Sequence, residues 1–311
     1  MEAAATGDIL DVTERDPEGV MGEQRAEISE RRFAFYPGCL VLQRMQQYEL
    51  STKRLLAGLG VTLTDMPEAA CCGAPVVESF SDEWLLLAAY NLALAERMGL
   101  DILTVCGSCT NSLKRALLAL QDAALRERVN RRLAPLDLKV ERGVAVRHQV
   151  QVLAGLQDAL RERVVAPQRL KVALTYPCQV FRPSEVAAFD DPLRPRAMHD
   201  LAALTGATIV ETGVEWECCG SSYSMSDQPL ALAAGRRKLE ASLDADILVD
   251  GCGNCHLLLQ RMQGAIWGEQ EHRRMPVLFL PQLLGLALGL APEELGVGGS
   301  VAELLRRAGH G

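Results

Sequence analysis

Ten cysteines constrain this chain more than any other feature, because they form one five-cysteine pattern that occurs twice. In each copy a single cysteine is followed by a Cys-Cys-Gly tripeptide and then by a Cys-x-x-Cys pair, and no cysteine is left over. Corresponding cysteines are 139, 147 and 146 residues apart along the three parts of the pattern, which indicates an internal duplication. The first pentad is Cys39, Cys71, Cys72, Cys106 and Cys109, and the second is Cys178, Cys218, Cys219, Cys252 and Cys255.

The residues around the two pentads repeat as well. Four apolar, strand-like runs follow one another in each copy, and helical patterns separate them. This alternation predicts an α/β fold of two similar halves, each a small parallel sheet flanked by helices, related by internal duplication. The runs are FAFY, VTLTD, DILTV and GVAVRH in the first copy, and VALTY, ATIVE, DILVD and MPVLFL in the second.

The cysteines lie where a parallel sheet gathers its ligands. The first cysteine and the Cys-x-x-Cys pair of each copy come just past the carboxyl end of a predicted strand, and the Cys-Cys-Gly tripeptides are expected on loops beside them. A helical pattern stops before Pro167 and the second copy begins there. We therefore expect a first CCG domain at 31–166, a second at 167–292 and a C-terminal tail at 293–311.

Charge and hydropathy exclude several classes of protein. The net charge is −8, and residues 1–30 alone contribute −7, so we expect this segment to be a disordered acidic arm. The remainder is nearly neutral, which gives no support to nucleic-acid binding. No apolar run reaches the roughly 20 residues of a membrane-spanning helix, and no export signal is visible. The expected location is the cytoplasm, with no membrane span.

Thiols in this pattern favour metal ligation over disulfides in a reducing compartment. A Cys-x-x-Cys turn presents two sulfurs to one centre, whereas adjacent cysteines diverge and suit different atoms of a polynuclear iron–sulfur cluster. Five thiols also exceed the four that zinc takes, although structural zinc stays an alternative. Gly73 and Gly220 are interpreted as positions of close backbone approach to an inorganic core. Cys252 to His256 also matches a haem-attachment motif, but the first copy lacks the histidine.

The stretches FAFYPGCL, DILTVCGSCTNSL, CGNCHLLL and MPVLFLPQLLGLALG carry a resemblance. From about Phe33 to Gly289 the chain resembles the B-subunit family of heterodisulfide reductase, whose hallmark is two copies of a cysteine-rich CCG domain. The resemblance implies that each pentad holds one noncubane [4Fe-4S] cluster. It also implies that the two clusters face each other across a cavity in which a disulfide is cleaved.

The resemblance further implies an activity and partners. The chain would be the catalytic iron–sulfur subunit of a heterodisulfide-reductase-like complex, an oxidoreductase that reduces, or forms, a disulfide in a small disulfide or thiol substrate. The ferredoxin-like iron–sulfur C subunit of such a complex would supply electrons and would be fed by its flavin-containing A subunit. The alternative is an electron-transfer subunit that relays electrons between a dehydrogenase partner and a quinone or carrier.

Two histidines are candidate proton donors for chemistry centred on the clusters. His256 follows the last cysteine directly, and the alternative for it is a partly exposed position at a helix start. His148 ends the fourth predicted strand of the first half, where the alternative is a structural hydrogen bond.

Overall fold

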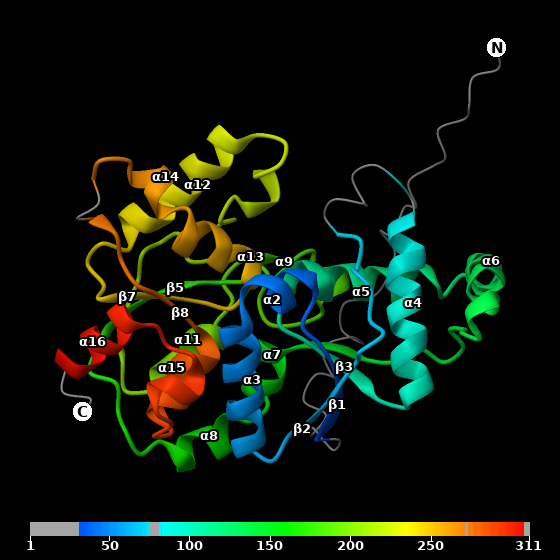
Figure 1. The fold of residues 1–311 in the computed structure, drawn as a ribbon, viewed down its shortest axis with the longest axis horizontal. Coiled ribbons are helices and arrows are strands. Elements are labelled where there is room, and N and C mark those ends of the chain that lie inside the picture. Colours follow the sequence, from blue (N-terminus) through cyan, green and yellow to red (C-terminus); the bar gives the residue numbers. More distant parts are fainter. Residues whose placement is uncertain (1–30, 75–80, 82, 271–272, 308–311) are drawn as a thin grey trace.

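Two four-stranded parallel sheets form the framework of the protein (Figure 1). The computed structural model describes residues 31–74, 81, 83–270 and 273–307, so the predicted acidic arm at 1–30 lies outside the described residues. The strand order is β2-β1-β3-β4 in the first sheet and β6-β5-β7-β8 in the second. The strands are β1 (Arg32–Tyr36), β2 (Thr62–Asp65), β3 (Asp101–Thr104), β4 (Val146–His148), β5 (Lys171–Thr175), β6 (Thr208–Val210), β7 (Ile247–Asp250) and β8 (Val277–Phe279).

The identical strand order confirms the predicted α/β fold and the duplication. The central strands are buried on both faces, as apolar runs such as FAFY and ILVD require in a parallel sheet covered by helices. Equivalent pairs are also in equivalent register: Tyr36 pairs with Thr104 in the first sheet, and Thr175 pairs with Asp250 in the second. Each half therefore presents the carboxyl ends of its strands in the same way.

Helices cover both faces of the sheets (Figure 1). Those of the first half are α2 (Cys39–Arg44), α3 (Gln46–Gly58), α4 (Glu83–Met98), α5 (Gly107–Ala119), α6 (Ala123–Leu133), η3 (Ala134–Leu136), α7 (Gln149–Ala154) and α8 (Gln157–Arg163). Those that follow are α9 (Cys178–Phe181), α10 (Ser184–Ala187), α11 (Ala197–Leu204), η4 (Ser221–Tyr223), α12 (Gln228–Ala241), α13 (Gly253–His256), the π-helix η5 (Leu257–Arg261), α14 (Gln263–Trp267), α15 (Leu280–Ala287), η7 (Pro292–Leu295) and α16 (Gly299–Arg307).

The two halves share their cores. One apolar cluster contains residues from both sheets, such as Phe35 and Leu174, and the cluster on the other sheet faces does the same. Helix α3 of the first half packs on α15 of the second, and the Tyr48 ring stacks on Phe279 with centroids 3.8 Å apart. An aromatic pair of this kind contributes about 0.5–1.5 kcal/mol beyond its buried area. The halves are thus fixed against each other by a continuous interior.

The stretch predicted as a tail, 293–311, takes part in this interior as far as it is described. Leu295 is fully buried, and its carbonyl accepts a hydrogen bond from the Gln282 side chain at 3.0 Å. Helix α16 follows with Val301 on its buried side. The domain boundaries themselves stay a prediction. Among the described helices, none combines the length and the apolar character that a bilayer crossing demands.

Candidate metal centre

All ten cysteines lie at the carboxyl edges of the sheets, because each follows a strand. Cys39 begins α2 after β1, and Cys178 begins α9 after β5. Cys106 and Cys252 precede the first turns of α5 and α13, after β3 and β7. The N–H groups that open a helix favour negative charge, so these positions suit thiolates. Helix α5 packs on α9 and α13 packs on α2, which brings the two edges together at the centre of the molecule (Figure 1).

The Cys-Cys-Gly tripeptide has a local physical reason. Gly73 and Gly220 have φ angles of 84° and 94°, in the left-handed region that favours glycine. In this conformation the glycine N–H donates to the first thiol of the pair, at 3.4 Å for Cys71 and at 3.4 Å for Cys218. The motif therefore supplies two adjacent thiols together with a backbone donor for the first of them.

We expect Gly220→Ala to lose much of the metal of the second pentad. An added Cβ would lie 2.7 Å from the Ala231 carbonyl oxygen, in addition to the cost of the positive φ angle. Gly213→Ala is the matched control, since it has a φ of 74° but open space around the added Cβ. We expect Gly213→Ala to cost about 1 kcal/mol and Gly220→Ala about 3 kcal/mol. Urea unfolding and metal content measure this, and equal losses in the two variants would contradict it.

The ten thiols form a series in which each interacts with the next. Two of its steps are thiol–thiol hydrogen bonds, from Cys39 to Cys71 at 3.8 Å and from Cys72 to Cys109 at 3.4 Å. The series passes from one half to the other between Cys106 and Cys252. Its order is Cys39, Cys71, Cys72, Cys109, Cys106, Cys252, Cys255, Cys219, Cys218 and Cys178. The two pentads therefore meet as mirror-ordered halves of a single array.

Hydrogen bonds lower the pKa of three thiols of the array. The bond from the Cys39 thiol, with others from Cys72 and the Gly73 N–H, lowers the pKa of Cys71 to about 2. For Cys218 the largest cause is a hydrogen bond from the Cys178 thiol, and the pKa of Cys218 is also lowered to about 2. A bond from Cys106 holds the pKa of Cys252 well below its usual value. Thiolates are the ligands that metals require, and these positions favour them.

Exposure varies along the array. Cys39 and Cys218, near its two ends, are exposed, and Cys71 and Cys178 are half-buried. The other six are buried, including Cys106 and Cys252 where the halves meet. At this junction the Gly107 N–H donates to the Cys252 sulfur at 3.3 Å, and the Asn254 amide lies 3.8 Å from the Cys106 sulfur.

The donor set fits polynuclear metal centres. All ten cysteines are free of disulfides, although neighbouring sulfurs lie within 4 Å of one another in two places. Adjacent thiols, backbone donors aimed at sulfur and five thiols per half match what iron–sulfur clusters use. In the described part of the chain, no three or more His, Cys, Asp or Glu side chains are arranged around the position of a single metal ion.

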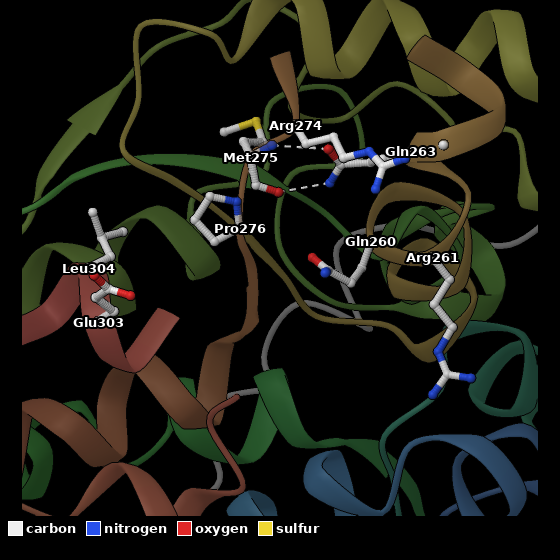
Figure 2. A pocket seen from close by; sticks show the side chains of 9 residues that line it. Gln260, Arg261, Gln263, Arg274, Met275, Pro276, Glu303 and Leu304 are labelled. Atoms are coloured by element: carbon white, nitrogen blue, oxygen red, sulfur yellow. Dashed lines mark hydrogen bonds between the residues drawn. The ribbon is translucent and has the colours of Figure 1, made fainter. Parts of the chain in front are cut away.

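A surface pocket of about 580 Å³ lies elsewhere (Figure 2). It is lined by residues of η5 and α14, by α16 and by the segment that leads into β8, and no cysteine contributes to it. Figure 2 shows the Gln263 side chain bonded to both backbone groups of Met275, just before β8 begins. The pocket is therefore at the amino edge of the second sheet, whereas the cysteines are at the carboxyl edge.

His256 is buried, so the alternative of a partly exposed position at a helix start is wrong. Its Nδ1 lies 2.9 Å from a carboxylate oxygen of Asp250, and its ring stacks on Phe279 with centroids 3.9 Å apart. Burial raises the pKa of Asp250 to about 6. His148 is also fully buried, its Nδ1 accepts the Val150 N–H at 3.3 Å, and burial lowers its pKa to about 4. Its Nε2 has no hydrogen-bond partner among the described residues.

Sequence reasoning missed two features near the second pentad. Asp250 and His256 occupy the positions of Thr104 and Thr110 in the first half, whose hydroxyls lie 2.5 Å apart. Lys238 on α12 is buried although it belongs to a charged stretch of sequence. The offsets between the two copies, applied to every residue instead of the cysteines alone, would have drawn attention to both.

Fold and site define a duplicated α/β protein in which two cysteine pentads converge at the joined carboxyl edges of two parallel sheets. Comparison with known proteins agrees with this class. The cysteine-rich domain called CCG matches residues 33–114 and 172–260. A crystal structure of a hypothetical protein from Helicobacter pylori has the same fold, with a TM-score of 0.65 and 17% identity over 90% of this chain and 55% of that one.

Two curated relatives align over most of both chains. The B subunit of the Ferredoxin/F(420)H(2)-dependent CoB-CoM heterodisulfide reductase of Methanosarcina acetivorans is 35% identical, over 86% of this chain and 92% of the relative. The 8-methylmenaquinol:fumarate reductase membrane anchor subunit of Wolinella succinogenes is 31% identical, over 88% of this chain and 98% of the relative. The chain belongs to the B-subunit family of heterodisulfide reductase; it is an iron–sulfur redox subunit and contains two CCG domains.

Proposed function

We propose that the chain is the catalytic subunit of a heterodisulfide-reductase-like complex in the cytoplasm, with one noncubane [4Fe-4S] cluster on each pentad. The observation that carries the proposal is the single array of ten thiols, continuous across the junction of Cys106 and Cys252. Two centres held this close together suit a reaction that needs two electrons at one place. The relative from Methanosarcina acetivorans supports the assignment by its name and by its identity over nearly its whole length.

The reaction is reduction of a small disulfide, or its reverse. Two electrons and two protons enter, the S–S bond breaks, and two thiols form. Clusters held by the two pentads would supply the electrons, one for each of the two sulfurs. The described residues contain no ferredoxin-like Cys-x-x-Cys-x-x-Cys run, so we propose that a ferredoxin-like C subunit delivers the electrons and that a flavin-containing A subunit feeds it.

The chain's own residues orient the cysteine ligands and the candidate proton donors. The N–H groups of Gly73 and Gly220 orient the thiolates of Cys71 and Cys218. His256 and His148 stay the candidate proton donors: Asp250 fixes the ring of His256, and the Val150 N–H fixes that of His148. With Nδ1 of His148 accepting, the N–H of its neutral ring is on Nε2, where it can donate a hydrogen bond.

A second function is favoured by a specific comparison. The relative from Wolinella succinogenes aligns with this chain over 98% of its own length and is named as part of a fumarate reductase. In this alternative the chain relays electrons between a dehydrogenase partner and a quinone or carrier, and no disulfide reaches the array. The burial of Cys106 and Cys252 where the halves meet is compatible with such a relay.

Metal content and electron paramagnetic resonance of anaerobically purified protein test the proposal. We expect about eight iron atoms and an equal amount of acid-labile sulfide per chain, since two [4Fe-4S] clusters contain that number. After mild oxidation, a small thiol such as coenzyme M is expected to change the paramagnetic signal, because a substrate sulfur reaches a cluster.

Each other outcome has a defined meaning. Iron near four per chain would mean that one pentad is empty. Eight iron atoms per chain with a paramagnetic signal that no thiol or disulfide changes would favour the relay over the catalyst. Zinc without iron would overturn both functions and leave a zinc-stabilised scaffold.

A further inference from the structure

The duplication is broken at one buried position beside the cysteines. The offset of 147 residues that relates the two Cys-Cys-Gly tripeptides also relates Asn91 on α4 to Lys238 on α12. Both side chains are buried, with exposed fractions of 0% and 1%. One half therefore has a neutral amide where the other has a cation.

Asn91 tethers the loop that carries the first tripeptide. Its Oδ1 accepts the Ala70 N–H at 2.9 Å, and its Nδ2 donates to the carbonyls of Leu87 at 2.9 Å and Cys71 at 3.5 Å. These bonds hold the loop without bringing a charge to it. A neutral side chain is thus sufficient for the structural task at this position.

Lys238 tethers the equivalent loop of the second half, but it does so with a charge. Its Nζ donates to the carbonyl oxygens of Val214 at 2.5 Å and Glu215 at 3.1 Å. Among the described residues, no carboxylate lies within ion-pair distance of its Nζ. Glu217 acts on it electrostatically but is itself paired with Arg237. A buried cation is costly unless negative charge compensates it.

Lys238 lies beside the second pentad, because Val214 and Glu215, whose carbonyls accept its hydrogen bonds, come shortly before Cys218 in the same loop. Burial lowers the pKa of Lys238, while Cys255, Cys219, Cys178 and Glu217 act in the opposite direction. Lys238 in turn helps to lower the pKa of Cys218. The cation therefore lies within electrostatic reach of these thiols, in an interior where such interactions are stronger than in water.

We propose that Lys238 makes the metal centre of the second pentad easier to reduce than that of the first, so that the first electron to enter the chain settles on the second centre. Reduction adds one negative charge to a centre, and a nearby buried cation stabilises that charge. The first centre has the neutral Asn91 at the equivalent place and lacks this stabilisation. The inference rests on the proposed function, because it needs a cluster on each pentad.

The test is a potentiometric titration of the full iron-loaded chain, followed by electron paramagnetic resonance. Lys238→Gln removes the charge and keeps a donor, Lys238→Met removes both, and Lys238→Arg keeps the charge. Lys171→Met is the matched control, because it removes an exposed lysine at the opposite, amino edge of the same sheet. Variants that lack the cysteine pair of one tripeptide identify which transition belongs to which pentad.

In both uncharged variants we expect the transition of the second centre to shift to lower potential. The expected shift is at least tenfold in its reduction equilibrium, about 59 mV for one electron. The transition of the first centre is expected to keep its potential in both uncharged variants. In Lys238→Arg we expect the transition of the second centre to stay near its original potential. Lys171→Met is expected to change neither transition. If Lys238→Gln does not fold, Lys238→Met and Lys238→Arg give the same comparison.

Two results would overturn the inference. In one, iron content is full but neither transition moves in the uncharged variants, so Lys238 is only a tether. In the other, the transition of the first centre moves instead. A parent protein with no iron and no transition would defeat the proposed function itself, and this result is distinct from the other two.

Discussion

Replacement of Cys218 and Cys219 by alanine is expected to halve the iron content, from about eight to about four atoms per chain. Both thiols of the second tripeptide are lost, and with them the lowered pKa that makes Cys218 a good ligand. The loop also loses the bond between the Gly220 N–H and the Cys218 sulfur. Iron and sulfide analysis, together with the number of redox transitions, measures the effect.

The equivalent variant of the first half, Cys71→Ala with Cys72→Ala, is the matched control. It is expected to lose the other four iron atoms, about half of the total, and to keep the transition that the first variant lacks. Complete loss of iron from either variant would show that the two pentads cannot be filled independently. Retention of all iron would show that the tripeptides are not ligands.

The positions of the cysteines could be predicted from the sequence because they depend on local rules. Cys39, Cys106 and Cys252 follow strands whose apolar runs are plain in the sequence, and parallel strands place such residues at one edge. Because the chain is duplicated, the fold predicted for one half is also the prediction for the other. What could not be predicted is the contact of Cys106 with Cys252, since it depends on how two sheets pack across 146 residues of chain.

Burial of charged and polar residues was equally beyond local rules. The stretch GRRKLEA on α12 has the composition of a solvated helix face, yet Lys238 is buried while Arg237 beside it is exposed. The position of His256 next to Cys255 indicates a place near the ligands, but nothing local in the sequence links it to Asp250, six residues earlier. Helical periodicity indicates which face is apolar, but only the tertiary structure shows which polar groups that face accommodates.

His256→Thr is expected to lower the free energy of unfolding by about 3–5 kcal/mol, because it leaves the carboxylate of Asp250 buried without its partner. Asp250 is fully buried, and its other carboxylate oxygen already lacks a hydrogen bond among the described residues. Asp250→Thr alone is expected to cost less, since a neutral imidazole tolerates burial better than a carboxylate. Anaerobic urea unfolding of the iron-loaded chain, followed by tryptophan fluorescence, gives the values.

The double variant, Asp250→Thr with His256→Thr, recreates in the second half the pair that Thr104 and Thr110 form in the first. We expect it to be more stable than His256→Thr, with a coupling energy between the two sites of about 2 kcal/mol. It still lacks the stacking of His256 on Phe279, so full recovery is not expected. Strictly additive losses would show that the pair contributes no mutual stabilisation. The iron content of the double variant then separates the two uses of His256: unchanged iron with lost response to thiols would leave it a role in proton transfer, whereas lost iron would make it a support of the ligand loop.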